Sequence, residues 1–310
     1  MSKIEWCDRS DWNPVRGCTR ISEGCRNCYA EAIAARFSGP GQPFEGFAER
    51  TPSGPRWTGK VALLPERLSL PLRWRKPAVI FPNSMFDLFH EDLTDDDIAH
   101  VVGVMVAAVH LRGHTFTPLT KRTARAARLL KTESFWCRAN EWAGSEVMDR
   151  VDLLDWCSDD AWAMLDDYGP DTPPPGIWWG FSGEDQETVD QRWTDVEMLA
   201  ASGWRQIWCS LEPMLGGVDL TRRIILGWLA GIVVGGEGGP KARPMHPDWV
   251  RSLRDQCAGG GVPFFFKQWG EFGPRYGAAK AKVVERVGKA RAGRKLDGRT
   301  HDDLPWRRAA

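Results

Sequence analysis

Residues 177–211 read IWWGFSGEDQETVDQRWTDVEMLAASGWRQIWCSL, and this stretch contains two apolar runs separated by a helix-like segment. The runs Ile177–Phe181 and Gln206–Leu211 are apolar almost throughout, which favours strands that are buried on both faces of a parallel sheet. Between them, Gln186–Ala201 has the length and the composition of a helix. A strand, a helix and a second strand in this order predict a right-handed β-α-β unit.

The same alternation extends along most of the 310 residues. Thr94 is a favourable N-cap for a helix that carries three aspartates in its first turn. About seven or eight strands of this kind predict an α/β fold with a complete or partial TIM-like (β/α) barrel, and a doubly wound sheet is the alternative. The further strands that we expect are Val61–Leu64, Ala78–Pro82, His114–Leu119, Gly231–Gly235 and Val262–Phe266, and the further helices are 95–111, Lys121–Lys131 and His246–Ala258.

Two regions of opposite charge accompany this pattern. Ten acidic residues and one basic residue lie between Glu141 and Asp171, whereas eleven Lys or Arg and four acids lie between Arg275 and the end of the chain. We expect one barrel-like domain over residues 1–275, with an acidic insertion at about 141–175, and a basic C-terminal extension over 276–310 that packs on the barrel. A basic extension suits phosphate groups, and a solvated tail is the alternative.

The bulk properties narrow the class of protein. The formal net charge is zero, so overall charge argues neither for nor against a nucleic-acid partner. We find no apolar run that is long enough to span a bilayer and no signal peptide, so we expect a cytoplasmic protein without a membrane partner. In a reducing cytoplasm the eight cysteines need not form disulfides. The segment Gly39–Arg75 is rich in Pro, Gly and Arg and reads as a long loop.

The run GCTRISEGCRNCYA at residues 17–30 carries three closely spaced cysteines, Cys18, Cys25 and Cys28. Thiolates gathered in this way are more often metal ligands than disulfide partners. Three thiolates are one short of the four protein ligands of a structural zinc site or an ordinary iron–sulfur cluster. A zinc site would take its fourth ligand from Cys7, Asp11 or His90, whereas an iron–sulfur centre could keep one position open for chemistry.

Polar or charged side chains stand at or after the carboxyl ends of six expected strands. In a parallel sheet or barrel these ends meet at one edge, which is where such folds place their active sites. Buried carboxylates at this edge need a cation, a metal or a hydrogen-bonding substrate, and basic groups there suit a carboxylate or a phosphate. The residues are Asn83, Ser84, Asp87, His90, Thr120, Lys121, Arg122, Ser182, Glu184, Asp185, Glu212, Gly235, Gly236, Glu237, Lys267 and Gln268.

These residues receive different expected roles. The glycines before Glu237 would let the polar part of a ligand approach backbone N–H groups, although they could also only form a tight turn. We expect four residues to be catalytic, namely Asp87, Lys121, Glu212 and Lys267. We expect five others to bind a cofactor, namely Ser182, Glu184, Gly235, Gly236 and Glu237, beside a metal held by Cys18, Cys25 and Cys28.

The three-cysteine run, preceded by Asp11-Trp12-Asn13-Pro14, resembles a family of phage-borne and bacterial proteins of unknown function with a three-cysteine motif. That family is in turn distantly similar to the radical S-adenosylmethionine enzymes. The resemblance covers most of the chain. Its further motifs are Asn83-Ser84-Met85-Phe86-Asp87-Leu88-Phe89-His90, Leu119-Thr120-Lys121-Arg122, Gly180-Phe181-Ser182-Gly183-Glu184-Asp185-Gln186, Ser210-Leu211-Glu212-Pro213-Met214-Leu215, Gly235-Gly236-Glu237, Phe266-Lys267-Gln268-Trp269-Gly270 and Leu296-Asp297-Gly298-Arg299.

The resemblance implies a partial or full barrel in which the three cysteines bind a [4Fe–4S] cluster. Its fourth iron would carry the methionyl amine and carboxylate of S-adenosylmethionine. This chain departs from the usual radical pattern in three places. The first gap between cysteines has six residues rather than three, the aromatic Tyr29 follows the last cysteine rather than preceding it, and the Gly-Gly-Glu segment at 235–237 lies far downstream.

We therefore expect a radical S-adenosylmethionine-type iron–sulfur enzyme that modifies a nucleic-acid base or a nucleotide in a phage context, in the host cytoplasm if a phage encodes it. A flavodoxin or a ferredoxin would be its electron donor. The alternative is a zinc-binding protein that associates with nucleic acid through its basic tail and performs no radical chemistry. A third possibility is a degenerate barrel that keeps its metal only for folding.

Overall fold

The centre of the molecule is a parallel sheet of five strands. A computed structural model describes residues 4–148, 168–274 and 284–307. The strands follow one another in the order β11-β10-β9-β8-β7, so that neighbours in sequence are neighbours in the sheet. Every residue of β8, β9 and β10 is buried, as expected for strands covered on both faces. Their bounds are Leu119–Thr120 for β7, Trp179–Gly183 for β8, Ile207–Leu211 for β9, Gly231–Gly235 for β10 and Phe264–Gln268 for β11.

Parallel pairing continues beyond β7 toward the N-terminal part of the chain. The strand β5 (Val79–Ile80) pairs in parallel with β6 (Thr115–Phe116). Isolated parallel bridges join Arg9 to Ile80 and Phe116 to Ile177. The expected run His114–Leu119 is divided into β6 and β7 around Pro118, which has no N–H to donate to a neighbouring strand.

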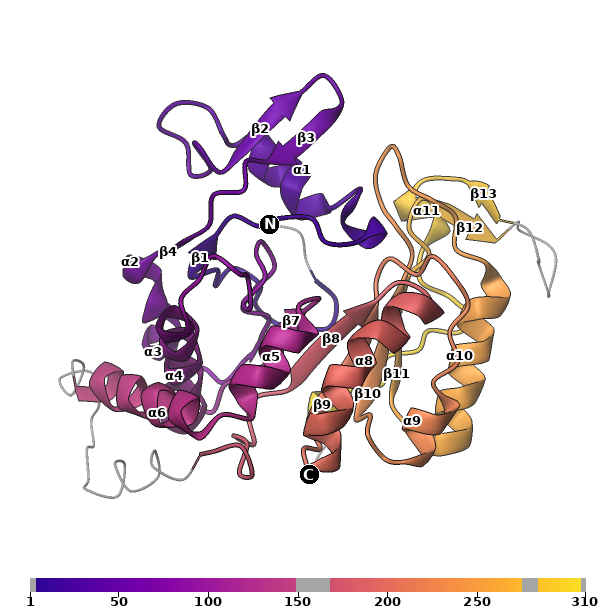
Figure 1. The fold of residues 1–310 in the computed structure, drawn as a ribbon. Coiled ribbons are helices and arrows are strands. Elements are labelled where there is room, and N and C mark those ends of the chain that lie inside the picture. The colour runs from indigo at the N-terminus through magenta and orange to yellow at the C-terminus, as the bar shows by residue number, and fades with distance from the viewer. Residues whose placement is uncertain (1–3, 149–167, 275–283, 308–310) are drawn as a thin grey trace.

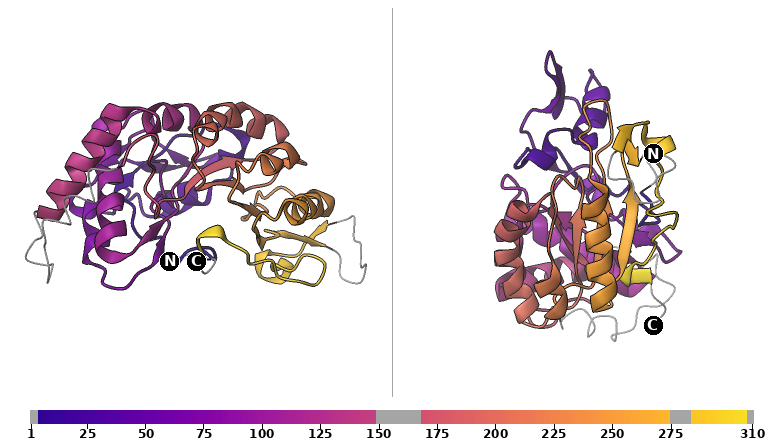
Figure 2. Two further views of the ribbon diagram at one scale, coloured as in Figure 1. Left: turned by 90° about the horizontal axis from the view of Figure 1, so that it is seen from below. Right: turned by 90° about the vertical axis from the view of Figure 1, so that its right-hand side faces the viewer.

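The helices that alternate with the strands lie on the convex outer side of the curved sheet, and the first and last described segments lie on its inner side (Figures 1 and 2). The helix α4 (Asp95–Arg112) begins at Thr94 with a capping box, in which Thr94 and Asp97 satisfy each other's backbone N–H groups. The expected helix at 186–201 is confirmed as α8 (Gln186–Ala201). The other long helices are α5 (Thr123–Leu130), α6 (Glu133–Met148) and α10 (Pro247–Gly260).

Two expectations from the sequence are wrong. The run Val61–Leu64 does not join the parallel sheet, because β4 (Ala62–Leu63) pairs antiparallel with β1 (Val15–Arg16) and is only half-buried. The segment Gly39–Arg75 is more than a loop, since it holds a hairpin and two short helices. These are β2 (Ala48–Thr51), β3 (Gly54–Trp57), α2 (Pro65–Leu68) and α3 (Leu70–Arg73).

The first part of the expected acidic insertion at about 141–175 lies in a helix. Residues 141–148 are the second half of α6, which packs on α4 through buried side chains such as Trp136, Ala139 and Ala143. Residues 149–167 of the expected insertion lie outside the described residues. The division of the chain at residue 275 stays a prediction.

An aromatic cluster fills the inner side of the sheet between the two chain ends. Trp208 of β9 contacts Trp6 and Trp306 with ring centroids 5.2 and 5.1 Å apart, and Trp6 contacts Phe81 at 4.6 Å. The indole N–H of Trp306 donates to the carbonyl of Trp6 at 3.2 Å. Large edge-to-face aromatic contacts of this kind bury much apolar area. The first and last described segments therefore close the inner face of the sheet together.

The remaining elements of the described chain are short. They are η1 (Glu23–Cys25), α1 (Tyr29–Arg36), α9 (Thr221–Ile225), β12 (Phe272–Pro274), β13 (Val284–Arg286), α11 (Lys289–Ala292) and η3 (Pro305–Arg307). Within the described residues, no helix combines the length and the apolar character needed to cross a membrane.

Candidate functional site

The three cysteines lie on one loop, residues 17–28, that connects β1 to α1 and that we call the cysteine loop. Cys25 ends the 3-10 helix η1, and Cys28 is the N-cap residue of α1. All three thiols are free and half-buried. The loop therefore presents three sulfur donors without a disulfide among them.

Burial and neighbouring groups change the pKa of two of the three thiols. Burial raises the pKa of Cys18 to about 12, and the neighbouring Cys28 and Cys25 add to this while Arg122 opposes it. Burial also raises the pKa of Cys28, whereas N–H groups in the first turn of α1 act in the opposite direction. Within the described residues, no three His, Cys, Asp or Glu side chains are grouped so that they could hold a metal ion. At Cys18 and Cys28, whose pKa is raised, thiolate character would need the charge of a bound cation.

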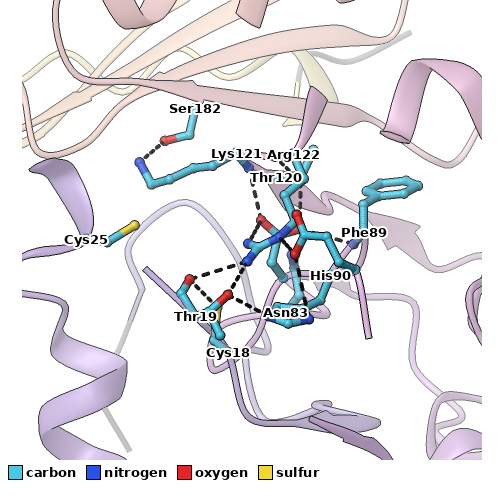
Figure 3. A network of polar contacts seen from close by, with 12 residues as sticks. Cys18, Thr19, Cys25, Asn83, Phe89, His90, Thr120, Lys121, Arg122 and Ser182 are labelled. Atoms are coloured by element: carbon cyan, nitrogen blue, oxygen red, sulfur yellow. Dashed lines mark hydrogen bonds and ion pairs between the residues drawn. The ribbon is translucent and has the colours of Figure 1, made fainter. Parts of the chain in front are cut away.

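A first set of contacts holds the residue after Cys18. The backbone N–H of Asp92 donates to Nδ1 of His90 at 3.2 Å, so the proton of His90 lies on Nε2, which donates to Oγ1 of Thr19 at 2.8 Å. The guanidinium of Arg122 donates to the same hydroxyl at 2.7 Å. Figure 3 shows both side chains converging on Thr19 beside Cys18.

Asp87 fixes Arg122 in this position. Its carboxylate accepts hydrogen bonds from the hydroxyl of Thr120 at 2.6 Å, from the N–H of Lys121 at 3.1 Å and from the guanidinium of Arg122 at 3.2 Å. The N–H of Phe89 donates to it at 3.0 Å. Asp87 is thus a buried, fully paired group, and the paired charge raises the pKa of Arg122 despite burial.

A second set of contacts holds the segment before Cys25. Glu184, which follows β8 and is 1% exposed, accepts a hydrogen bond from Ser22 at 2.8 Å. It also pairs with Lys121 and, at 3.0 Å, with Arg192 of α8. Burial acts to raise the pKa of Glu184, but Lys121 and Arg192 outweigh it and lower this pKa to about 2. The ammonium of Lys121 also donates to Ser182 at 2.9 Å.

Gly24 brings the cysteine loop directly against this carboxylate. A Cβ atom at Gly24 would lie 2.3 Å from Oε1 of Glu184 and 2.4 Å from its Cγ. Contacts this short do not occur between real side chains, and Glu184 is held by its two cationic partners. Only glycine fits this approach.

A third set of contacts holds the residue before Cys28. Glu237, two residues after β10, accepts from the side-chain amide of Asn27 at 3.1 Å. Arg243 donates to the same carboxylate through its backbone N–H at 2.8 Å and through its guanidinium at 2.7 and 3.0 Å. Arg243 also donates to the carbonyl of Glu23 at 2.9 Å. After the opposing effect of burial, these hydrogen bonds lower the pKa of Glu237.

Glu212 and Lys267 form a separate pair at the same edge of the sheet. The ammonium of Lys267 lies 3.1 and 3.3 Å from the two carboxylate oxygens of Glu212. Both side chains keep some exposure, 17% for Glu212 and 15% for Lys267. Gly235 allows this placement, since a Cβ there would lie 2.3 Å from Oε1 of Glu212. Gly236 packs equally closely on the backbone of Trp269.

Tyr29 lies at the start of α1, directly after Cys28. Its hydroxyl donates to the carbonyl of Ser84 at 2.6 Å, and the residue is 47% exposed. Asn83 uses its amide to bridge backbone groups of Leu119. The segment after β5 is therefore tied both to α1 and to β7.

The side chains considered as a fourth metal ligand are engaged elsewhere. The thiol of Cys7 donates to the carbonyl of Ile4 at 3.7 Å, and burial raises its pKa to about 12. Asp11 pairs with Arg9 at 2.7 Å. Both nitrogens of His90 are used by Thr19 and by the backbone of Asp92.

The expected edge residues lie at or after the carboxyl ends of parallel strands, with Thr120, Ser182, Gly235, Lys267 and Gln268 still within the strands. Asp87, Lys121, Glu184 and Glu237 gather around the cysteine loop through the contacts above. The sequence did not predict the residues that contact Arg122, Glu184 and Glu237, which are Thr19, Ser22, Asn27, Arg192 and Arg243. Arg192 carried a usable signal, because it lies two helical turns after Glu184, on the face of α8 that returns to the end of β8.

Comparison with known proteins gives one match. A family model described as "Protein of unknown function (DUF5131)" matches residues 1–305. No curated protein and no solved structure matches the chain.

Proposed function

The chain belongs to the DUF5131 family of proteins of unknown function, and we propose that it is an iron–sulfur enzyme of the radical S-adenosylmethionine type. The observation that carries the proposal is a loop with three free thiols, Cys18, Cys25 and Cys28, anchored at the carboxyl edge of a parallel sheet. The considered fourth ligands are occupied by other contacts. Three thiolates and one open position suit a [4Fe–4S] cluster that also binds a cosubstrate.

In this proposal the parallel sheet is a partial TIM-like barrel. Two observations support it. The strands are neighbours in sequence order, from β7 to β11. The sheet is curved, with helices on its convex side (Figure 2). The polar groups at the carboxyl ends of its strands then share the side on which barrel enzymes bind their substrates.

The donor set fits such a cluster in number and chemistry, because Cys18, Cys25 and Cys28 are free thiols on one loop. Since these side chains are not grouped around a metal position in the described residues, the proposal requires them to turn toward one another when the cluster binds. When bound, the cluster supplies an electron for reductive cleavage of S-adenosylmethionine. Cys18, Cys25 and Cys28 are the residues that would hold it. Of the expected cofactor-binding residues, Glu184 and Glu237 already bind the cysteine loop, Ser182 accepts a hydrogen bond from Lys121, and the N–H of Gly236 donates to the carbonyl of Gln268. In this proposal a cosubstrate takes the place of one of these contacts.

The substrate class in this proposal is a nucleic-acid base or a nucleotide. Lys267 can donate and Glu212 can accept hydrogen bonds, which is what the polar edge of a base requires. The half-exposed ring of Tyr29 offers a surface on which a base can stack. Lys121 is committed to Glu184 and Ser182, and Asp87 to Arg122, so these two residues position other groups rather than meet the substrate.

A reduced flavodoxin or ferredoxin in the cytoplasm, of the host if the chain is phage-encoded, would supply the electron. The second candidate is a zinc protein that associates with nucleic acid and performs no radical chemistry. The exposed cations Lys289 and Arg291 of α11 favour a phosphate-bearing partner under either proposal.

The test is the metal content of anaerobically purified protein. The proposal expects a brown protein with about four iron and four sulfide per chain, as for one such cluster. With a chemical reductant, this protein should release 5′-deoxyadenosine and methionine from S-adenosylmethionine. Colourless protein that carries zinc, and that gains no iron on anaerobic reconstitution, would establish the second candidate instead.

A further inference from the structure

Each cysteine of the cysteine loop lies within three residues of a side chain that contacts an ion pair at the carboxyl edge of the sheet. We infer that three ion-pair anchors fix the cysteine loop before any metal binds, and that Arg122, Glu184 and Glu237 are positioning residues for Cys18, Cys25 and Cys28. The loop-side contacts are Thr19, next to Cys18, Ser22, three residues before Cys25, and Asn27, next to Cys28.

The anchors come from three different parts of the sheet. Arg122 follows β7, Glu184 follows β8 and Glu237 follows β10. Each one binds a different segment of the loop, and the three share no loop-side partner. Removing one contact should therefore loosen one segment and leave the other two largely as they are.

The carboxylate of Glu237 is already satisfied within the chain. Its Oε2 atom accepts hydrogen bonds from Asn27 and from two nitrogens of Arg243, and its Oε1 atom accepts one more from Arg243. Glu237 is 6% exposed, so a ligand amine would have to displace Arg243 in order to reach it. This arrangement assigns Glu237 to the loop rather than to a cofactor.

The carboxylate of Glu184 is also satisfied by partners within the chain. It is 1% exposed and balanced by Lys121 and Arg192. Buried ion pairs are costly to disrupt, because the partner that remains is left as an uncompensated charge. Gly24 and Ser22 pack on this carboxylate, so the loop shares the rigidity of the pair.

Amide hydrogen exchange of metal-free, full-length protein tests the inference residue by residue. Three backbone amides inside the loop report its order, since they donate to carbonyls of the same loop: Cys25 to Ser22 at 3.0 Å, Arg26 to Glu23 at 3.1 Å and Cys28 to Cys25 at 3.3 Å. We expect these amides to be protected without metal. Exposed loops lacking such anchors exchange by local opening at little cost.

Three loop-side variants each remove one anchor contact and leave the ion pairs at the edge of the sheet intact. Thr19→Val also removes the contact with His90, and Asn27→Ala also removes the hydrogen bond to the carbonyl of Lys241. Ser22→Ala should speed exchange of the Cys25 amide about tenfold, and Asn27→Ala should do the same for the Cys28 amide, since loss of a hydrogen bond to a charged group weakens local closure by this order. Thr19→Val should loosen residues near Cys18 alone. Ser38→Ala is the matched control, because it removes the hydroxyl that donates to Ala35 at 3.2 Å outside the loop.

Glu237→Gln is the sheet-side test, with its thermal unfolding recorded to show that it folds. Faster exchange at Cys28 in metal-free Glu237→Gln supports the inference. Unprotected loop amides in the metal-free wild type, or variants whose loop exchange equals that of Ser38→Ala, would overturn it. The inference does not rest on the proposed function: a protected loop in a protein that never binds iron would refute only the proposed function.

Discussion

The Nδ2 atom of Asn27 donates to Oε2 of Glu237 at 3.1 Å, across 210 residues of sequence. The contact joins the residue before Cys28 to the residue that follows the pair Gly235-Gly236 at the end of β10. Arg243 completes it by binding both Glu237 and the carbonyl of Glu23. The cysteine loop is thus held by hydrogen bonds to the segment that follows β10.

Replacing any one of Cys18, Cys25 and Cys28 by Ala should abolish the metal centre, since two thiolates are too few to hold it. Metal analysis of the anaerobically purified variants checks this. Cys137→Ser is the control, because Cys137 is free and exposed on α6. Full metal content in all three alanine variants would contradict the assignment of the cysteines.

The pair of Glu184 with Lys121 and Arg192 should make stability depend on pH in the acid range. The pKa of Glu184 is lowered to about 2 in the folded protein, below its ordinary value, so its stabilisation is present above the ordinary value and is lost as pH falls toward 2. At about 1.4 kcal/mol per pH unit, this amounts to about 3 kcal/mol. Urea unfolding between pH 6 and pH 2 measures it.

The variant Glu184→Gln cannot gain a proton at this position, so its free energy of unfolding should fall less steeply than that of the wild type over the same pH range. If the free energy of unfolding of the two proteins falls equally with pH, folding does not lower the pKa of Glu184.

Glu212→Gln and Lys267→Met should impair activity more than stability. Each variant leaves the largely buried partner without its charged contact, which costs about 1–3 kcal/mol of folding stability, whereas loss of one catalytic polar group lowers a rate by about a hundredfold or more in protein that still folds. The measurements are 5′-deoxyadenosine release and the free energy of unfolding for each variant. Unchanged release in both variants would remove the pair from the catalytic residues.

Gly24→Ala should destabilise the protein by about 1–3 kcal/mol, because the new methyl group meets the fixed carboxylate of Glu184. Chemical denaturation measures the change. Gly238→Ala is the matched control: a Cβ there meets no atom within 4 Å. Equal stability of the two variants would mean that the loop yields easily at Gly24.

Thr94→Ala should cost about 1 kcal/mol of stability, since it removes the side-chain acceptor of the capping box at the start of α4. Thr94→Ser keeps the hydroxyl and should behave as wild type. Thermal unfolding of the two variants distinguishes these outcomes, and a Thr94→Ala protein as stable as Thr94→Ser would show that the box contributes nothing.

Much of the sheet could be predicted, because apolar runs such as Gly231–Gly235 correspond to fully buried strands. The run Val61–Leu64 misled because a short apolar run does not reveal whether its partner is parallel or antiparallel. The helix α6 was not predicted, although Phe135, Ala139 and Ala143 recur at helical spacing, because its acidic second half has the composition of a surface insertion.

The candidate site could be predicted only as a set of positions. That carboxylates follow β8 and β10 is visible in the sequence, but the partners of these carboxylates are not. Asn27 and Arg243 reach Glu237 from segments whose placement depends on long-range folding. Hydrogen-bond partners separated by such distances in the chain leave no local pattern.

The contact between Trp6 and Trp306 also bears on how the protein is made. Trp6, Trp178 and Trp208 have part of their aromatic partners only once Trp306 is in place. On the ribosome, where synthesis proceeds from the N-terminus, the inner face of the sheet stays open until the segment around Trp306 has emerged. A nascent chain halted before this point exposes indole rings to the chaperones of the cell, and a truncated gene product that lacks residues 304–307 should aggregate even though every strand of the parallel sheet is present.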